Sequence, residues 1–308
     1  MLAADRRTIL VLKADTEPVE TLTIPRTSRA RMRVASSSSV TPEVVHRLGR
    51  RPGTVVVTSD ALGDPQTAAL LAGLSLAGVR VVRPHDYHER VLRRVSLEDI
   101  DESWFLFHRP LRARRAYAAV KRVTDWVAGL LGSLLVCLVV PLVALVVRLE
   151  DGGPVFFRQA RVGRGGRPFA IWKFRTMRMD AEADGPVWAA QDDCRVTRVG
   201  RVLRRTRLDE LPQFFNLLKG DMSLVGPRPE RPRFTSLLER AVPFYDRRHL
   251  MRPGITGWAS VRFGYGASVG DKWRSHEYDL YYLKHRSLSL DLEILARTVV
   301  VMLLRRGQ

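Results

Sequence analysis

The pattern of apolar and polar residues divides this chain into three parts. In residues 1–110, the β-branched runs Ile9–Leu12, Thr54–Thr58 and Val79–Val82 predict short buried strands of a parallel sheet. The Ala/Leu-rich segment Gln66–Ala77, between the last two runs, has a helical period. We therefore expect a small soluble α/β domain that resembles part of a nucleotide-binding fold.

Nucleotide binding is not predicted for this domain, because no G-x-G-x-x-G motif follows any of its strands. A structural or regulatory appendage is the preferred interpretation. The segment Arg26–Ser39 is basic and then Ser-rich, and it is predicted to be a loop. The first apolar stretch, Thr8–Leu12, is too brief for a signal peptide.

A long apolar run, Trp126–Val147, contains no charged side chain. As a helix it is roughly long enough to cross a bilayer core of ~30 Å, and it lacks the polar face of a buried soluble helix. Pro141 lies inside the run and is expected to kink it, because proline lacks an N–H and clashes with the preceding turn. A second apolar segment, Leu288–Leu304, is predicted to be a helix, either in the core or in the membrane interface.

Basic residues flank the apolar run on both sides. They are Arg112, Arg114, Arg115, Lys121 and Arg122 before it, and Arg148, Arg158, Arg161 and Arg164 after it. Basic flanks stay on the cytoplasmic side of a membrane, so a re-entrant helix is preferred to a straight span. The expected order is a basic juxtamembrane linker at 111–125, the re-entrant helix at 126–147 and a cytoplasmic α+β catalytic domain at 148–308.

Within this last part, Pro154–Arg161 and Pro168–Met177 alternate apolar and polar residues around Gly163–Gly166, which predicts a β-hairpin. A basic cluster that contains Lys173 and Arg175 closes the hairpin. It is either a strand end with solvated charges or a clamp for a phosphate group.

An acidic pair, Asp209-Glu210, lies in the predicted helix start Leu208–Pro212, where acidic residues and proline are both favoured. Helix capping is one interpretation of the pair. The neighbouring residues favour another. Arginines precede the pair at Arg201, Arg204, Arg205 and Arg207, and Arg228 follows it between two prolines. A backbone restricted in this way suits a guanidinium that presents its fork to a phosphate.

Nearby positive charge is expected to keep such a carboxylate ionised, with a lowered pKa. An ionised aspartate can attack phosphorus as a nucleophile. Because adjacent residues on a helix face different ways, Asp209 and Glu210 are not expected to share a proton. We expect one carboxylate to attack and the other to hold Mg²⁺, which favours a carboxylate together with substrate phosphates.

The composition adds a strong positive charge, with 51 Lys+Arg against 32 Asp+Glu and a net charge of +19. An anionic partner is expected: nucleic acid, acidic lipid or a phosphorylated substrate. A non-catalytic nucleic-acid-binding or membrane-surface module explains the charge but not the charge-free run, and the aromatic residues are not interleaved as base stacking requires. Cys137 and Cys194 match no zinc-site spacing and are not expected to pair, which suits a reducing compartment.

Taken together, residues Lys121 to Arg297 resemble the bacterial sugar transferases, the monotopic polyprenyl-phosphate phosphoglycosyl transferases. The matching strings are DGGPVFFRQARVGRGGRPFAIWKFRTM (151–177), TRVGRVLRRTRLDELPQFFNLLKGDMSLVGPRPE (197–230), RPGITGWASV (252–261) and YDLYYLKHRSLSLDLEILARTV (278–299). Residues 85–104 resemble the linker of longer, exopolysaccharide-type members, which carry spanning helices before such a unit. Whether this chain is naturally short or a fragment stays open.

The resemblance implies an enzyme of the bacterial inner membrane whose catalytic domain faces the cytoplasm and anionic inner-leaflet lipid. Such an enzyme moves a sugar-1-phosphate from a UDP-sugar to undecaprenyl phosphate and releases UMP, with Mg²⁺ and a covalent phosphosugar intermediate. The membrane helix of the family breaks at a Ser-Pro pair, of which Val140-Pro141 keeps the proline but not the serine. Nucleic acid is not an expected partner.

Residue by residue, the resemblance implies Asp209 as the nucleophile and Glu210 as the ligand of the cation. Lys173, Arg204 and Arg228 fall where the family places basic residues near the phosphates. Direct attack by the lipid phosphate, with Asp209 as a metal ligand only, stays open. So do the oligomeric state and the sugar, which could be glucose, galactose or an acetamido sugar.

Overall fold

A computed structural model describes residues 9–13, 32–36, 54–57, 62–98, 100–107, 115–183, 185, 193–264, 266 and 268–303. The chain divides into two compact units, Met1–Ile100 and Asp101–Gln308, which we describe separately. The predicted domain boundary at residue 110 falls in 108–114, outside the described residues.

The first unit is built on a parallel sheet with the strand order β2-β1-β3-β4. Its elements are β1 (Ile9–Lys13), β2 (Met32–Ser36), β3 (Thr54–Val57), α3 (Pro65–Leu76), β4 (Arg80–Val82) and α4 (Pro84–Leu92). Val55, Val56 and Val57 are buried, as expected of a β-branched run in a parallel sheet. The predicted strands and helix of this unit are confirmed, and its resemblance to a nucleotide-binding fold stays a prediction.

Strand β2 corrects the predicted loop at Arg26–Ser39. Met32 to Ser36 pair in register with Ile9 to Lys13 along the edge of the sheet. The basic and Ser-rich residues of this segment predicted a loop. The strand forms through backbone hydrogen bonds with β1, which do not depend on the identity of the side chains. The strand therefore forms where composition alone gave no signal for it.

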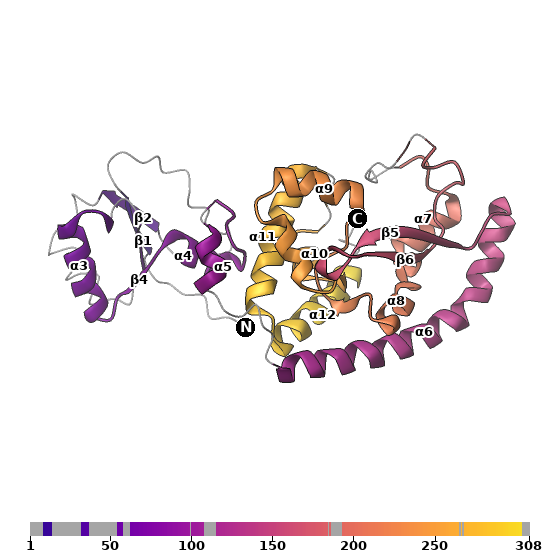
Figure 1. Ribbon diagram of the computed structural model, residues 1–308, viewed down its shortest axis with the longest axis horizontal. Helices are drawn as coiled ribbons and strands as arrows, with labels where there is room; N and C mark the ends of the chain where they lie inside the picture. The colour runs from indigo at the N-terminus through magenta and orange to yellow at the C-terminus, as the bar shows by residue number, and fades with distance from the viewer. Residues whose placement is uncertain are drawn as a thin grey trace. The chain divides into compact units, whose positions relative to one another are not determined.

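The second unit mixes helices with short strands (Figure 1). Its first half contains α5 (Glu102–Phe107), α6 (Arg115–Asp151), β5 (Phe156–Val162), the 3₁₀ helix η4 (Arg164–Gly166), β6 (Pro168–Phe174), α7 (Arg198–Arg205), η5 (Leu208–Glu210) and α8 (Gln213–Lys219). Its second half contains β7 (Ser223–Val225), α9 (Pro232–Ala241), η6 (Tyr245–Leu250), β8 (Gly254–Thr256), α10 (Trp258–Arg262), α11 (Val269–His285) and α12 (Leu288–Leu303). The predicted hairpin is confirmed as the antiparallel pair β5–β6, and the predicted C-terminal helix as α12.

Helix α6 runs from Arg115 to Asp151 and continues through Pro141. Figure 1 shows it along one side of the unit and bending toward its C-terminal end. Its most apolar window has a mean hydropathy of 3.0, and among the described residues it is the one helix long and apolar enough to cross a membrane. Many of its large apolar side chains are exposed: Trp126, Val127, Leu130, Leu131, Leu134, Leu135, Leu138, Leu142 and Leu145.

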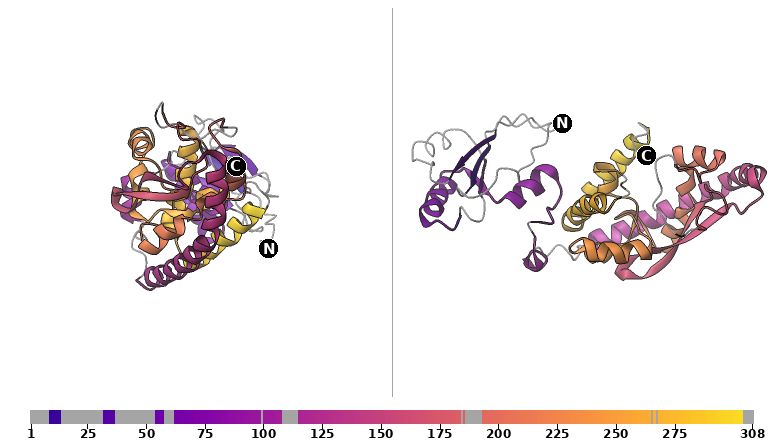
Figure 2. Two further views of the ribbon diagram at one scale, coloured as in Figure 1. Left: turned by 90° about the vertical axis from the view of Figure 1, so that its right-hand side faces the viewer. Right: turned by 90° about the horizontal axis from the view of Figure 1, so that it is seen from above.

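Helix α6 runs past the other elements of the unit (Figure 2). Helix α8 packs closely against it because two glycines of α6 face α8. A Cβ atom at Gly132 would lie 2.2 Å from the Phe214 ring, and one at Gly129 would lie 2.8 Å from the backbone nitrogen of Leu218. Beyond the glycines, Val136 of α6 joins Phe174 of the hairpin in a buried cluster. The candidate membrane helix is therefore part of the same packed body as the hairpin and α8.

The core between α11 and η6 contains a buried histidine, His276, which is 1% exposed. Its Nε2 lies 3.0 Å from the carbonyl oxygen of Phe244. Burial, together with the positive charge of Arg248, lowers the pKa of His276 from 6.5 to about 3. The imidazole is therefore neutral in the folded protein at neutral pH and acts as a hydrogen-bond donor to Phe244.

We expect His276 to make the fold sensitive to acid. Below pH 6.5 the unfolded chain binds a proton that the folded chain excludes, so stability falls until the pH reaches about 3. The loss is up to about 1.4 kcal/mol per pH unit. Thermal unfolding between pH 4 and 7 measures it, and His276→Gln, which does not titrate, should show a shallower slope. The same slope in both proteins would contradict the assignment.

Candidate active site

The acidic pair lies in the short 3₁₀ helix η5, between α7 and α8. The residue before η5, Arg207, has a left-handed backbone with φ 60°, which is uncommon for a non-glycine residue. Helix α8 begins only after Pro212, and neither helix start has a side-chain cap. The pair therefore does not act as a helix cap, and the predicted helix start at Leu208 is shifted to Gln213.

Glu210 is the meeting point of three cationic side chains. Its Oε1 accepts from Nη2 of Arg228 at 2.7 Å and from Nζ of Lys173 at 3.2 Å, and Nη1 of Arg207 lies 4.0 Å away. Burial by itself raises the pKa of Glu210, but Arg228 and Lys173 outweigh it and hold the pKa well below its usual range. Glu210 is thus an ionised carboxylate, as the sequence predicted.

Asp209 differs from its neighbour. It is 6% exposed, and its Oδ1 is buried without a hydrogen-bond partner among the described residues. Burial raises the pKa of Asp209, Lys173 opposes this rise and the charge of Glu210 adds to it. The lowered pKa predicted for a carboxylate in this setting is therefore wrong for Asp209, because desolvation exceeds the effect of the nearby cations.

The basic residues predicted around the pair divide into two groups. Lys173, Arg204 and Arg228 lie near the pair. Burial lowers the pKa values of Lys173 and Arg204, and the negative charge of Asp209 opposes this lowering in both. Arg204 also donates from Nε to Oγ1 of Thr176 at 2.9 Å. Arg175 lies elsewhere, because its guanidinium binds Asp151 at the end of α6.

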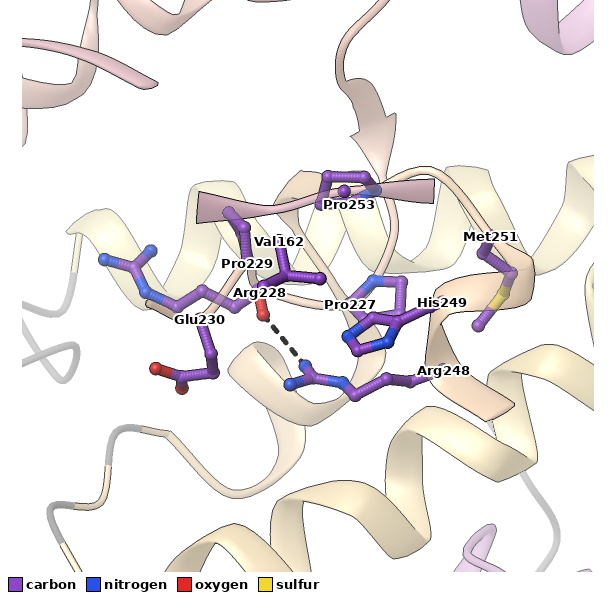
Figure 3. A pocket seen from close by; sticks show the side chains of 10 residues that line it. Val162, Pro227, Arg228, Pro229, Glu230, Arg248, His249, Met251 and Pro253 are labelled. Carbon is purple, nitrogen blue, oxygen red and sulfur yellow. Dashed lines mark hydrogen bonds between the residues drawn. The ribbon is translucent and has the colours of Figure 1, made fainter. Parts of the chain in front are cut away.

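Two arginine side chains bind the backbone of the loop that carries Arg228. Arg248 donates from Nη2 to the carbonyl oxygen of Arg228 at 2.8 Å (Figure 3). The same Nη2 donates to Oδ2 of Asp279 at 2.9 Å. Arg161 donates from Nη1 to the carbonyl oxygen of Pro229 at 3.0 Å. The pocket beside the loop has a volume of about 10 Å³, too small for a substrate, so these contacts are structural.

The same loop is tied to the candidate membrane helix. Asp125 of α6 is 1% exposed, and its Oδ1 accepts from Oγ of Ser223 at 3.0 Å and from the backbone N–H of Leu224 at 2.9 Å. Ser223 and Leu224 belong to β7, which leads directly into the loop. The position of Arg228 therefore depends on α6 as well as on the core.

The sequence did not single out Arg161 or Arg248 as parts of the site. Arg161 could have been predicted from the sequence, because side chains of a strand alternate between its two faces. The register of the hairpin places Arg161 on the same face as Lys173. Arg248 gives no comparable signal, since it reaches the loop only through the packing of η6 on α11. Both act on the backbone of the loop.

The oxygen atoms of the pair suit Mg²⁺ in their chemistry. Mg²⁺ prefers hard oxygen ligands and commonly takes one or two carboxylates together with substrate phosphates. The described residues contain no group of three or more His, Cys, Asp or Glu that could hold a metal by itself. The buried, unpartnered Oδ1 of Asp209 and the ionised Glu210 fit a cation held largely by a phosphorylated substrate.

Residues 116–305 match the family described as bacterial sugar transferase. The chain belongs to this family. The UDP-N-acetylgalactosamine-undecaprenyl-phosphate N-acetylgalactosaminephosphotransferase of Aeromonas hydrophila is 43% identical over 231 residues, which cover 74% of this chain and 53% of that protein. The UDP-glucose:undecaprenyl-phosphate glucose-1-phosphate transferase of Escherichia coli is 42% identical over 182 residues, 58% of this chain and 39% of that protein.

A protein of Caulobacter vibrioides with the same name as the Escherichia coli relative is 44% identical over 181 residues, which cover 58% of this chain and 68% of that protein. The chain spans about half the length of the Aeromonas relative. The family match includes α6, the hairpin and the acidic pair in one continuous segment.

In this bacterial sugar transferase, we expect Arg248→Met to destabilise the fold by about 3–5 kcal/mol, because it leaves Asp279 as an uncompensated buried charge. Asp279→Asn should cost less, since Arg248 keeps the amide oxygen and the Arg228 carbonyl as acceptors and the negative charge of Glu230 nearby. Urea unfolding of both variants measures the difference. Small and equal losses would contradict the role assigned to Arg248.

Proposed function

We propose that this chain transfers a sugar-1-phosphate from a UDP-sugar to undecaprenyl phosphate and releases UMP, as the initiating step of exopolysaccharide or other glycan synthesis. The observation that supports it best is the pair Asp209-Glu210, of which Asp209 is buried and Glu210 is 11% exposed, among Lys173, Arg204 and Arg228. The names of the Aeromonas and Escherichia relatives both contain undecaprenyl phosphate and a UDP-sugar. The arrangement provides a nucleophile for phosphorus and cations for the phosphate charge.

In the first step, an ionised carboxylate oxygen of Asp209 attacks the β-phosphorus of the UDP-sugar. The bond from this phosphorus to the bridging oxygen breaks, and UMP leaves with the electron pair. Burial makes Asp209 poorly solvated and more basic than a free aspartate, which favours attack once its proton is lost. Lys173 and Arg204 stabilise both the ionised Asp209 and the charge on the transferred phosphoryl group.

In the second step, a phosphate oxygen of the lipid acceptor attacks the same phosphorus. The bond to Asp209 breaks, its carboxylate is restored, and the diphosphate-linked lipid leaves. Arg228 takes part in both steps as a fork that can bind phosphate oxygens, while its backbone is fixed by Arg248. Glu210 and the substrate phosphates would hold Mg²⁺, which would add to the neutralisation of the negative charge.

We propose the inner bacterial membrane as the location, with the catalytic part on the cytoplasmic face. The apolar residues exposed on α6 favour contact with lipid, and basic residues precede and follow its apolar run. The bend of α6 favours re-entry on the same face over a straight span (Figure 1). Re-entry keeps η5 and the hairpin beside the membrane surface, where the lipid phosphate lies.

Asp209→Asn tests the proposed nucleophile, because the amide keeps the shape of the side chain but cannot form the phosphosugar ester. UMP release from a panel of UDP-sugars should fall by about 10³-fold or more. Arg233→Gln, on the exposed side of α9, serves as the control and should leave the rate unchanged. Turnover of Asp209→Asn at the normal rate would refute the assignment.

Removal of divalent cations tests the proposed metal. EDTA should abolish UMP release, and added Mg²⁺ should restore it. In Glu210→Gln the Mg²⁺ concentration needed for half-maximal activity should rise by about tenfold or more, because the charged carboxylate that binds the cation is replaced by a neutral amide, and even the loss of a group that only orients a metal ligand lowers affinity by this order. Full activity in EDTA would show that the reaction needs no metal.

A further inference from the structure

A groove away from the acidic pair lies between α6, the β5–β6 hairpin and α8. Its lining comes from all three elements: Cys137 and Val140, Phe156 and Trp172, and Phe215 and Lys219. Its volume is about 510 Å³, within the range of clefts that bind small ligands. The groove opens beside the exposed apolar face of α6, so lipid can reach it if α6 lies in a membrane.

The floor of the groove is fixed by Asn216, which is 1% exposed. Its Nδ2 donates to the carbonyl oxygen of Ala170 at 2.7 Å, and its Oδ1 accepts from the backbone N–H of Trp172 at 3.0 Å. Both contacts join α8 to β6. The groove is therefore a preformed feature of the packed unit and does not depend on a loop.

The two ends of the groove differ in polarity. Cys137 and Val140 lie next to Pro141, deep in the apolar run of α6. At the other end, Lys219 is the last residue of α8. Arg122 lies near this end, because a Cβ atom on the following Gly220 would be 2.7 Å from Nη1 of Arg122. This nitrogen is buried without a hydrogen-bond partner among the described residues.

Arg158 adds another cation beside the groove. Its guanidinium lies over the Trp172 ring, 4.4 Å from the centroid, and its side chain is exposed. A ligand that matches this arrangement has an apolar tail and an anionic head. An amphiphile with a phosphate headgroup has this chemistry.

The groove does not lead to the reacting groups. Successive side chains of a strand point to opposite faces, so Trp172 faces away from Lys173, which binds Glu210. Lys219 is the last residue of α8, whereas η5 with Asp209 precedes that helix. A phosphate at Lys219 is therefore not placed for attack at Asp209, which favours a bound phospholipid over the lipid acceptor.

We propose that this groove binds an anionic phospholipid, with one acyl chain along Cys137 and Val140 and the headgroup phosphate at Lys219 and Arg158. The bound lipid bridges α6, α8 and the hairpin, the elements that position the acidic pair and Lys173. It therefore stabilises the packing of these elements on one another, and this effect does not require Asp209 to be the nucleophile.

Cys137 provides a probe inside the groove, and Cys194, which is also free, is removed by Cys194→Ser. The rate of maleimide alkylation of Cys137 is measured in detergent with phosphatidylglycerol or phosphatidylcholine of identical acyl chains. Phosphatidylglycerol should slow alkylation at a concentration roughly tenfold lower than phosphatidylcholine, because Arg158 and Lys219 add two positive charges and Asp221, which lies 3.3 Å from Nζ of Lys219, offsets only part of them. Phospholipid co-purified with the full chain should likewise be enriched in phosphatidylglycerol.

The double substitution Arg158→Gln/Lys219→Gln should remove the preference for phosphatidylglycerol. The charge-matched control Arg233→Gln/Arg240→Gln, on the exposed face of α9, should keep it. Equal protection by both lipids, protection by neither, or an unchanged preference in Arg158→Gln/Lys219→Gln would overturn the proposal. Stronger protection by undecaprenyl phosphate than by phosphatidylglycerol would overturn it in favour of the acceptor.

Discussion

The ion pair between Arg228 and Glu210 joins the segments on which the candidate site depends. It links the loop after β7 to η5, and Lys173 brings the hairpin to the same carboxylate oxygen. Charges this poorly exposed to water are costly unless each has partners. The contacts behind the loop, from Arg248, Arg161 and Asp125, hold the Arg228 backbone where the pair can form.

This arrangement gives two adjacent carboxylates different properties. Glu210 receives the cations and stays ionised, whereas Asp209 is desolvated and has no hydrogen-bond partner for its Oδ1 among the described residues. A carboxylate surrounded by donors is stabilised and a poor nucleophile, while a poorly solvated one is more basic and more reactive. The proposed division of labour, with attack by Asp209 and cation binding by Glu210, follows from this difference.

Much of this could be predicted from local patterns in the sequence. The hairpin, the apolar helix and α12 each follow from the period or the length of an apolar pattern, and the acidic pair stood out by its arginine neighbours. The direction of the Asp209 pKa could not be predicted, because it depends on burial by segments distant in sequence. For the same reason composition gave no sign of strand β2, and Arg248 is linked to Arg228 only by tertiary packing.

We propose that Asp209 forms a covalent bond to the transferred phosphosugar. The most direct measurement is intact-protein mass spectrometry after incubation with a UDP-sugar and Mg²⁺ in the absence of the lipid acceptor. We expect release of UMP and a mass increase of one sugar phosphate, located by peptide mapping to the segment that contains Asp209. UMP release only when undecaprenyl phosphate is present, with no adduct on the protein, would contradict it and indicate direct transfer to the lipid.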